Sequence, residues 1–355
     1  MLLQRTNQVL LFAFLFLGAM ILAHSFLIPF TFGALVAMLM LPLANFLERK
    51  KLKRIFSTIL CFSLFLMIIV TLFYAVYSQL GTFQKDIPSL KIKATQKITH
   101  FQDFIQTKTG FDALKQEEML HEKSAALIKT LETSGSHFLS TTSHVLVNFS
   151  LFLVYFFFFL MFRAKIKGFF LKIIDKKFQE ETTIVIYKIA KVTQQYLAGK
   201  MIVLLISATL NSLAFLVIGI EHAIFFGVLA AFLGIIPYVG TFLGAFFPAI
   251  IALLTQDTPT QALAVVVVIF GIHFVEGNIL IPAIIGEKVN LNALTAMLGI
   301  ITGGMIWGVA GMVLFIPLLG IFKIICDHVP DLNAIGYLIG NEKDIDAPLQ
   351  DVVKE

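Results

Sequence analysis

The chain has 355 residues, of which 58% are hydrophobic and only 14% are charged, and its formal net charge is +5 at pH 7. Soluble globular proteins carry about 25% charged residues, so this composition excludes a soluble protein and predicts an all-α integral membrane protein. The excess of basic residues does not indicate a nucleic-acid partner, because these residues lie next to apolar stretches, where membrane topology places them.

Eight apolar stretches are long enough to cross a bilayer as helices, for which about 20 residues are needed. They lie near residues 8–28, 30–47, 55–78, 145–162, 201–220, 223–254, 262–285 and 293–325. We expect the first two to form a tight hairpin that turns at Pro29. The N-terminus resembles a secretory signal, but hydrophobicity resumes at Phe26 and continues to Leu47, so we expect the first helix to remain uncleaved.

Lysine and arginine set the expected orientation, because they favour the cytoplasmic side of a membrane. The loop Glu48–Arg54 carries five of them and the segment Arg163–Lys200 carries nine. Both termini are therefore predicted to be cytoplasmic. In the same scheme the loops Glu221–His222 and Glu287–Lys288 lie outside, and the tip Thr255–Gln261 lies inside.

The spans and the polar stretches between them divide the chain into six parts. In chain order these are three N-terminal spans (1–78), an extracytoplasmic helical hairpin (79–144), the fourth span (145–162), a cytoplasmic amphipathic segment (163–200), a C-terminal core with broken helices (201–326) and a cytoplasmic tail (327–355). The outer hairpin suits a structural cap, an oligomer contact or a lid over a pathway. In the amphipathic segment, lysines frame an apolar face that includes Phe169 and Phe170, which is typical of a helix beside anionic lipid.

Proline and glycine interrupt the sixth apolar stretch at GIIPYVGTFLG, residues 234–244. Pro237 has no N–H to donate, and Gly240 and Gly244 have the spacing that lets another helix approach closely. An unsatisfied backbone group in hydrocarbon costs several kcal/mol, so a broken helix persists only where protein or water surrounds it. The pattern favours either a packing kink or a discontinuous helix whose end meets a solute or ion. Tyr238 lies beside the break, although an interfacial anchor is the commoner use of tyrosine.

A second interruption, HFVEGNILIPAIIG at residues 273–286, places ionisable and polar groups inside an apolar span. His273 and Glu276 are three residues apart and therefore neighbours on a helix surface, and Pro282 leaves the carbonyl of Asn278 without a donor. Ionisable residues inside a membrane usually mark a pathway, whereas the alternative for Glu276 is a carboxylate facing water near a helix end. The residues expected to line a substrate or ion pathway are Pro237, Tyr238, Gly240, His273, Glu276, Asn278, Pro282 and Gly286.

The last apolar stretch carries glycines at spacings that bring helix backbones together. The glycines expected to serve helix packing are Gly244, Gly299, Gly303, Gly304, Gly308 and Gly311. Such close packing suits one subunit or a homo-oligomer equally well. Cys61 and Cys326 lie in or at the end of apolar stretches and metal-ligand spacings are absent from the sequence, so we expect no disulfide framework, metal or cofactor.

Four segments of the chain resemble signatures of one known family. They are QYLAGK (195–200), IPYVGTFLGAFFPAIIAL (236–253), EGNILIPAIIGEKVNLNAL (276–294) and GGMIWGVAGMVLFIPLLGIFK (303–323). Together they resemble the autoinducer-2 exporter superfamily, the PerM-like permeases. The resemblance covers most of the chain and implies a multi-pass transporter of the bacterial inner membrane, with relatives that export autoinducer-2 or exchange sodium for protons.

Two broken helices, a buried carboxylate and glycine-rich neighbours predict a transporter of a small molecule or cation, surrounded by membrane lipids, rather than an enzyme. An intramembrane enzyme would need paired aspartates or a histidine–glutamate zinc motif within its spans, and the sequence has neither. Glu276 suits coupling to protons, whereas the amide of Asn278 suits a neutral solute with hydroxyl groups. Signal export and sodium–proton antiport both stay open. A third alternative is a protein that holds an envelope partner through residues 79–144 without transport.

Overall fold

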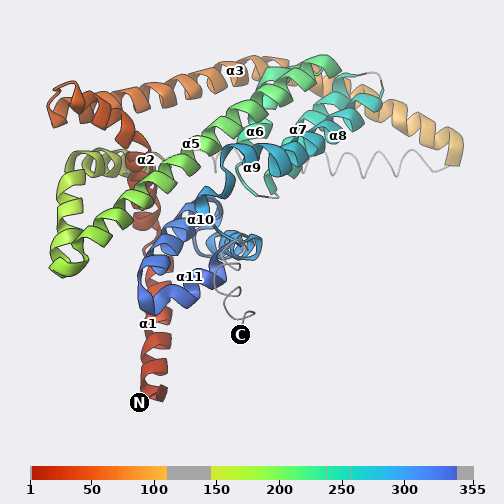
Figure 1. The fold of residues 1–355 in the computed structure, drawn as a ribbon. Helices are drawn as coiled ribbons and strands as arrows, with labels where there is room; N and C mark the ends of the chain where they lie inside the picture. The colour runs from red at the N-terminus through yellow and green to blue at the C-terminus, as the bar shows by residue number, and fades with distance from the viewer. Residues whose placement is uncertain (1, 110–144, 238, 257, 342–355) are drawn as a thin grey trace.

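The computed structural model describes residues 2–109, 145–237, 239–256 and 258–341. Within these ranges all regular secondary structure is helical, which confirms the all-α fold (Figure 1). By length and composition, six helical stretches can cross a membrane: His24–Arg49, Arg54–Gln79, Val145–Ile173, Lys176–Ile218, Thr260–Ile284 and Ala293–His328, the last of which is interrupted at Trp307 and Gly308. Two shorter apolar helices, Ala223–Leu233 and Val239–Thr255, accompany them. The protein is therefore a multi-pass membrane protein.

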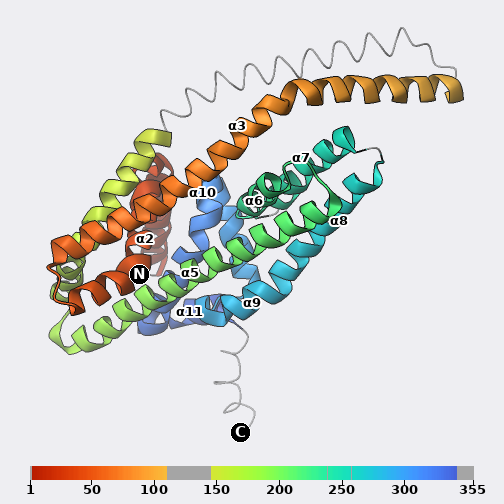
Figure 2. The same cartoon turned by 90° about the horizontal axis from the view of Figure 1, so that it is seen from above.

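Long helices build the N-terminal half of the molecule. They are α1 (Leu2–Leu22), α2 (His24–Arg49), α3 (Arg54–Thr109), the unlabelled helix Val145–Ile173 and α5 (Gln179–Ile218). The 40 residues of α5 rise about 60 Å, so this helix is much longer than the hydrocarbon core of a bilayer is thick. The end of α3 extends past the other helices in both Figure 1 and Figure 2.

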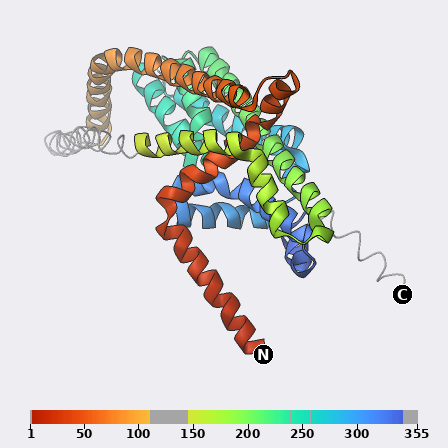
Figure 3. The ribbon, with the colours of Figure 1, turned by 90° about the vertical axis from the view of Figure 1, so that its left-hand side faces the viewer.

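The hairpin predicted at Pro29 is wrong. The break between the first two helices falls at Ala23, and Pro29 lies buried inside α2. Figure 3 shows α2 leaving the end of α1 at an angle, without returning alongside it. A proline removes one hydrogen bond from a helix, but packing against neighbouring helices can keep such a helix continuous. One turn after the proline, Gly33 lies directly against the backbone of Tyr155 and Phe156.

The predicted span 223–254 is a hairpin of two short helices, α6 (Ala223–Leu233) and α7 (Val239–Thr255). Gly240 lies against the carbonyl of Leu233, and Gly244 lies against Ala230. Residues that follow the turn therefore meet residues that precede it in reverse order, as in an antiparallel pair. With 11 residues, α6 rises about 17 Å, roughly half of the hydrocarbon thickness.

The C-terminal helix α10 (Ala293–His328), predicted as one span, is a hairpin as well. The turn is at Trp307 and Gly308, whose backbone angles are not helical, and φ of Gly308 is 60°. The pairs that meet across this hairpin are Gly303 with Gly311, Gly304 with Met312 and Gly299 with Leu319. Gly308 was expected among the packing glycines, but a side chain there would meet only open space. It serves the turn, because its positive φ favours glycine.

Further helical segments complete the C-terminal half; the first four connect these two hairpins, and the last two follow α10. They are α8 (Thr260–Val275), η2 (Glu276–Leu280), α9 (Ile281–Ile284), η3 (Gly286–Val289), η4 (Pro330–Leu332) and α11 (Asn333–Ile339). A buried apolar core joins α5, α6, α7 and α8, and Phe215, Phe226 and Val265 are among its members. This core packs the α6–α7 hairpin against α5 and α8.

The two hairpins open toward opposite ends of the molecule. Gln256, just after α7, donates a hydrogen bond from Nε2 to the carbonyl of Gly219 at 2.6 Å. Gly199, twenty residues earlier on α5, lies instead against Ile285. The segment from α8 to α9 therefore runs antiparallel to α5. Asn292 begins the α10 hairpin at the Ile285 end, where it is hydrogen-bonded to α11.

Two predictions about loop positions are wrong for this reason. The loop Glu221–His222 and the tip Thr255–Gln261, predicted on opposite faces, lie side by side at one end. The loop Glu287–Lys288, predicted on the same face as Glu221–His222, follows α9 at the other end. A single span would have carried the chain across, but the α6–α7 hairpin returns it to the face from which it came.

Two predicted segments are described only in part or are divided differently. The outer hairpin 79–144 is described as far as Thr109, up to which α3 continues from the third span without a break; its remainder lies outside the described residues. The segment 163–200 is shared between the end of the helix Val145–Ile173, η1 (Lys176–Phe178) and the first half of α5. Phe169 and Phe170 are exposed there, and contact with lipid stays a prediction.

Candidate functional site

A small cavity lies where α5, the tip of the α6–α7 hairpin and the junction of α8 with η2 meet. Its volume is about 20 Å³, which is room for a single water molecule. The polar side chains that line it are Ser207, Asn211, Thr241, His273 and Glu276. We call it the Glu276 cavity.

Glu276 is the acidic group of this cavity, and its carboxylate is buried. Ser207 donates a hydrogen bond from Oγ to Oε2 of Glu276 at 3.3 Å. Lys200 places Nζ 3.6 Å from Oε1, and His273 places Nδ1 3.9 Å from Oε2. Removing a carboxylate from water costs several kcal/mol unless a cation and hydrogen bonds compensate for it. Here Lys200 provides the cation and Ser207 provides the hydrogen bond.

Glu276 also opens a π-helical turn, the segment η2. The amide of Ile281 pairs with the carbonyl of Glu276, five residues back. In an α-helical register Pro282 would leave the carbonyl of Asn278 without a donor, as the sequence predicts. In a π register Pro282 lies five residues after Gly277, so the N–H that proline lacks would be the partner of the Gly277 carbonyl instead. Such single π turns are frequent at functional sites, because they widen the helix and redirect side chains.

Two buried acceptors of the cavity have no donor among the described residues. Asn211 is 5% exposed; its Nδ2 donates to the carbonyl of Ser207 at 2.8 Å, and its Oδ1 is left without a partner. Thr241, on the first turn of α7, is also 5% exposed, and its Oγ1 is likewise without a partner. A buried polar atom without a hydrogen bond costs about 1–3 kcal/mol. Both oxygens are therefore suited to accept hydrogen bonds from a ligand.

The C-terminal end of α6 closes the cavity beside Gly234. The amide of Ile235 donates to Phe232 at 3.2 Å, so the carbonyl of Ala231 loses its α-helical partner. Carbonyls at the end of a helix carry partial negative charge. The cavity is consequently rich in oxygen acceptors, with positive charge supplied from α5 by Lys200.

The structure brings several of the predicted pathway residues together. His273 and Glu276 both line the cavity, and His273 is on its more exposed side. Pro237 lies in the turn of the α6–α7 hairpin, and Gly240 directly precedes Thr241. These residues shape the tip of the hairpin rather than donate to a ligand themselves.

Other predicted residues lie away from the cavity. Asn278 is exposed, and its Nδ2 donates to the carbonyl of Phe274 at 2.8 Å. Pro282 and Gly286 are also exposed, and Gly286 has a φ of 59° at the start of η3. Tyr238 lies outside the described residues. The two interruptions thus meet through Glu276 and the α6–α7 tip, while Asn278 and Pro282 face outward.

Sequence reasoning missed Lys200, Ser207, Asn211 and Thr241. Ser207 is seven residues after Lys200, and Asn211 is four residues after Ser207, so the three form one polar stripe along an otherwise apolar helix. This spacing could have identified them from the sequence. Thr241 had no comparable signal, because a threonine in a membrane helix commonly bonds to its own backbone. Among the described residues, no group of three His, Cys, Asp or Glu side chains could hold a metal ion.

Comparison with known proteins gives consistent matches along the chain. A family model described as AI-2E family transporter matches residues 10–331. YueF of Bacillus subtilis (strain 168), provisionally named a transport protein, is 25% identical over 328 residues, which cover 88% of this chain and 86% of YueF. The AI-2 transport protein TqsA of Escherichia coli (strain K12) is 24% identical over 319 residues, 90% of each chain. YrrI of Bacillus subtilis (strain 168) is 32% identical over 133 residues, 38% of this chain and 37% of YrrI.

Proposed function

Because the chain belongs to the AI-2E transporter family, we propose that it carries a small polar solute across the bacterial inner membrane through the Glu276 cavity. Family membership supports a permease rather than an enzyme or an envelope-binding protein. The observation that carries the proposal is the burial of Glu276 between α5 and the tip of a half-length hairpin. Intramembrane carboxylates are rare and usually belong to a transport pathway.

The partners of Glu276 support a proposal of coupling to protons. In the arrangement seen here the carboxylate is compensated by Lys200 at 3.6 Å and by Ser207 at 3.3 Å. A proton that binds Glu276 removes the charge that Lys200 compensates, so it weakens this pairing. The strength of the contact between α5 and η2 then depends on protonation, which is the property that a proton-coupled carrier needs.

A solute with hydroxyl groups suits the two free acceptors. Asn211 Oδ1 and Thr241 Oγ1 are placed to accept two hydrogen bonds from such a ligand. The name of TqsA describes a transporter of AI-2, and we propose a hydroxyl-bearing signal molecule of this kind as the first candidate solute. The present cavity of about 20 Å³ is too small for it, so the hairpin has to move before a solute enters.

Sodium–proton antiport is the second candidate, supported by a different feature of the same cavity. Asn211, Thr241 and Glu276 all present oxygen atoms, and the C-terminal end of α6 adds partial negative charge beside them. Half-helix C-terminal ends and side-chain oxygens are the groups with which secondary transporters bind Na⁺. In this case Na⁺ and a proton would compete for Glu276.

Transport by the purified protein in lipid vesicles tests these proposals. One assay follows AI-2 and the other follows sodium-driven proton movement, side by side, for the parent and for Glu276→Gln. We expect the variant to fold normally and to lose dependence on the proton gradient in whichever assay the parent is active. Equal dependence on the gradient in parent and variant would remove Glu276 from the coupling mechanism.

A matched pair of asparagine variants tests the location of the solute. Asn211→Ala removes a free acceptor inside the cavity and should raise the KM for the solute roughly tenfold, as expected for a lost hydrogen bond of about 1.4 kcal/mol. Asn278→Ala, two residues beyond Glu276 but exposed, is the control and should leave the KM unchanged. The reverse result would place the solute on the outer surface of η2.

A further inference from the structure

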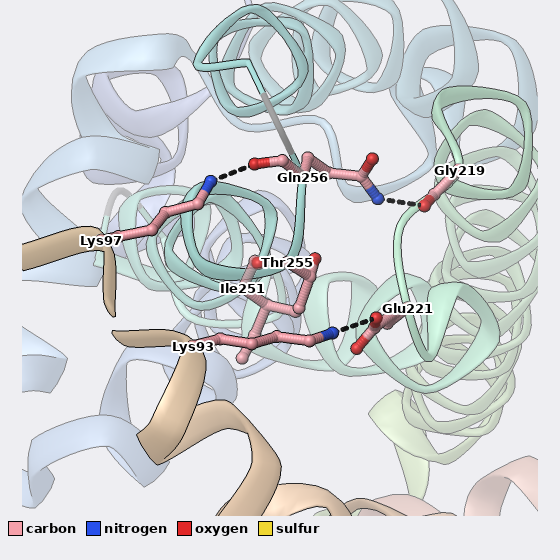
Figure 4. A network of polar contacts seen from close by, with 7 residues as sticks. All are labelled: Lys93, Lys97, Gly219, Glu221, Ile251, Thr255 and Gln256. Atoms are coloured by element: carbon pink, nitrogen blue, oxygen red, sulfur yellow. Dashed lines mark hydrogen bonds and ion pairs between the residues drawn. The ribbon is translucent and has the colours of Figure 1, made fainter. Parts of the chain in front are cut away.

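The arm of α3 beyond its membrane span crosses the base of the α6–α7 hairpin (Figure 4). Lys93 places Nζ 2.9 Å from Oε1 of Glu221, which lies in the loop that leads into α6. Lys97 donates from Nζ to the carbonyl of Gln256, which directly follows α7. The segment that leads into α6 and the segment that follows α7 are therefore both bound to α3.

The two lysines act from a single face of α3. They are four residues apart, and residues at this spacing lie next to one another on a helix surface. Gln256 connects the two loops to each other as well, through its hydrogen bond to the carbonyl of Gly219. Figure 4 shows Lys93 and Lys97 reaching from α3 toward the two loops. We call these contacts the α3 strap.

The base and the tip of the hairpin move together, because the hairpin is closely packed. Gly240 and Gly244 leave no space between α6 and α7, and Ile251 and Ala252 near its base are buried in the core. The tip contributes Gly234 and Thr241 to the Glu276 cavity. A restraint at the base therefore limits how far the tip can withdraw from the cavity.

We infer that Lys93 and Lys97 are positioning residues, which hold the α6–α7 hairpin against α5 and thereby control access to the Glu276 cavity. This inference rests on the proposed function, since it concerns opening of the proposed solute site. The Lys93 and Glu221 side chains are 40% and 41% exposed. Water screens an ion pair at this exposure, so the strap is weak enough to release and form again during transport.

A cysteine at Thr241 reports on opening without any need for transport. Its rate of modification by a small thiol reagent is measured in the purified protein, with Lys93→Glu, with Glu221→Lys and with both changes together. Each single change should raise the rate at least fivefold, because it replaces the ion pair between residues 93 and 221 with two like charges that repel each other. The double change restores opposite charges and should return the rate to within twofold of the parent.

The double change also separates the strap from general damage to the fold. A variant that misfolds is not restored by reversing both charges, so restoration supports the strap and its absence overturns it. Equal modification rates in all four proteins overturn it as well. Lys93→Gln provides a milder release and should give an intermediate rate.

Transport measurements distinguish failure of the strap from failure of the proposed function. Cysteines at Lys97 and Gln256 are joined by a short reducible cross-linker, which should lower the initial transport rate at least tenfold until a reductant is added. Unchanged transport after cross-linking overturns the strap and leaves the transporter intact. If the modification rate at position 241 depends on the charges at residues 93 and 221 but the protein moves neither AI-2 nor Na⁺, the strap is supported and the proposed solutes are overturned.

Discussion

Lys200 and Glu276 form an ion pair in which the acid is the more buried partner, with side chains 28% and 12% exposed. Such a pair contributes little net stability when intact, but loss of one partner leaves an uncompensated charge. Ser207 gives one hydrogen bond to the carboxylate, which cannot replace the lysine. At the scale of single residues, the main energetic cost of this arrangement is the removal of the Glu276 carboxylate from water.

Lys200→Met should therefore destabilise the protein by about 1–3 kcal/mol, below the 3–5 kcal/mol of a fully buried pair because Lys200 is partly exposed. The expected result is a lower Tm of the purified protein in detergent. Combining it with Glu276→Gln removes both charges and should recover most of the lost stability. A double variant as unstable as Lys200→Met alone would show that lysine acts through packing instead of charge.

Glu276 could be found from the sequence because a charge inside an apolar span is rare, and His273 followed from its spacing. Asn278 seemed equally placed, but η2 is π-helical, and the altered register leaves Asn278 on the exposed face. Whether a turn is π-helical depends on packing around it, which one sequence does not reveal. Asn211 and Ser207 lie on a different helix from Glu276, so their proximity depends on tertiary packing, which the sequence pattern does not reveal.

At the scale of helices, prolines and glycines in the sequence predict where the helices are interrupted. They do not predict that the chain turns back on itself between α6 and α7 and within α10. The apolar pattern predicts one span for residues 223–254 and one for residues 293–325, although each stretch is well over the roughly 20 residues that a span needs. A stretch of this length fits two half-length helices as well as one tilted helix. The choice is made by contacts such as Gly240 with Leu233 and Gly303 with Gly311. Because Gly303 and Gly311 meet within one hairpin, they give no support to a homo-oligomer.

Gly240→Ala tests the closeness of the α6–α7 hairpin. A methyl group at this position would collide with the carbonyl of Leu233, a backbone atom that cannot rotate away. We expect a loss of about 1–3 kcal/mol, as for other overpacked sites, seen as a lower Tm. Gly271→Ala on α8 is the matched control, because its side chain would meet open space and alanine favours a helix by up to about 1 kcal/mol. Equal Tm values for the two variants would argue against a tight hairpin.

At the scale of the whole molecule, the two hairpins enter from opposite ends and are held by different parts of the N-terminal half. The α3 strap binds the base of α6–α7. The tip of the α10 hairpin is held instead by Trp307, whose Nε1 donates to the carbonyl of Met20 at 3.0 Å. One hairpin is therefore restrained at its base and the other at its tip. Motion of the cavity wall is accordingly expected in α6–α7, where the tip makes the site.

The same arrangement predicts which loops face each side of the membrane. If the lysine-rich stretch before Lys200 is cytoplasmic, α5 carries the chain outward to Gly219, and Gln256 lies beside it. The C-terminal end of α10 then returns to the cytoplasmic side, where His328 Nε2 is 3.0 Å from Nζ of Lys188 on the first half of α5. The eight-span scheme differs from this one at the tip Thr255–Gln261, which it places inside, and at the loop Glu287–Lys288, which it places outside.

Cysteine labelling of intact cells distinguishes the two schemes. Thr258→Cys and Asp331→Cys are made separately; both positions are exposed, and the native Cys61 and Cys326 are buried and should not compete. An impermeant maleimide should react with the cysteine at 258 in intact cells and with the cysteine at 331 only after lysis. Protection of both sites until lysis would restore the single span at 223–254 and contradict the α6–α7 hairpin. Reaction at 331 with protection at 258 would keep the hairpin and invert the protein in the membrane, because the two sites would still lie on opposite faces.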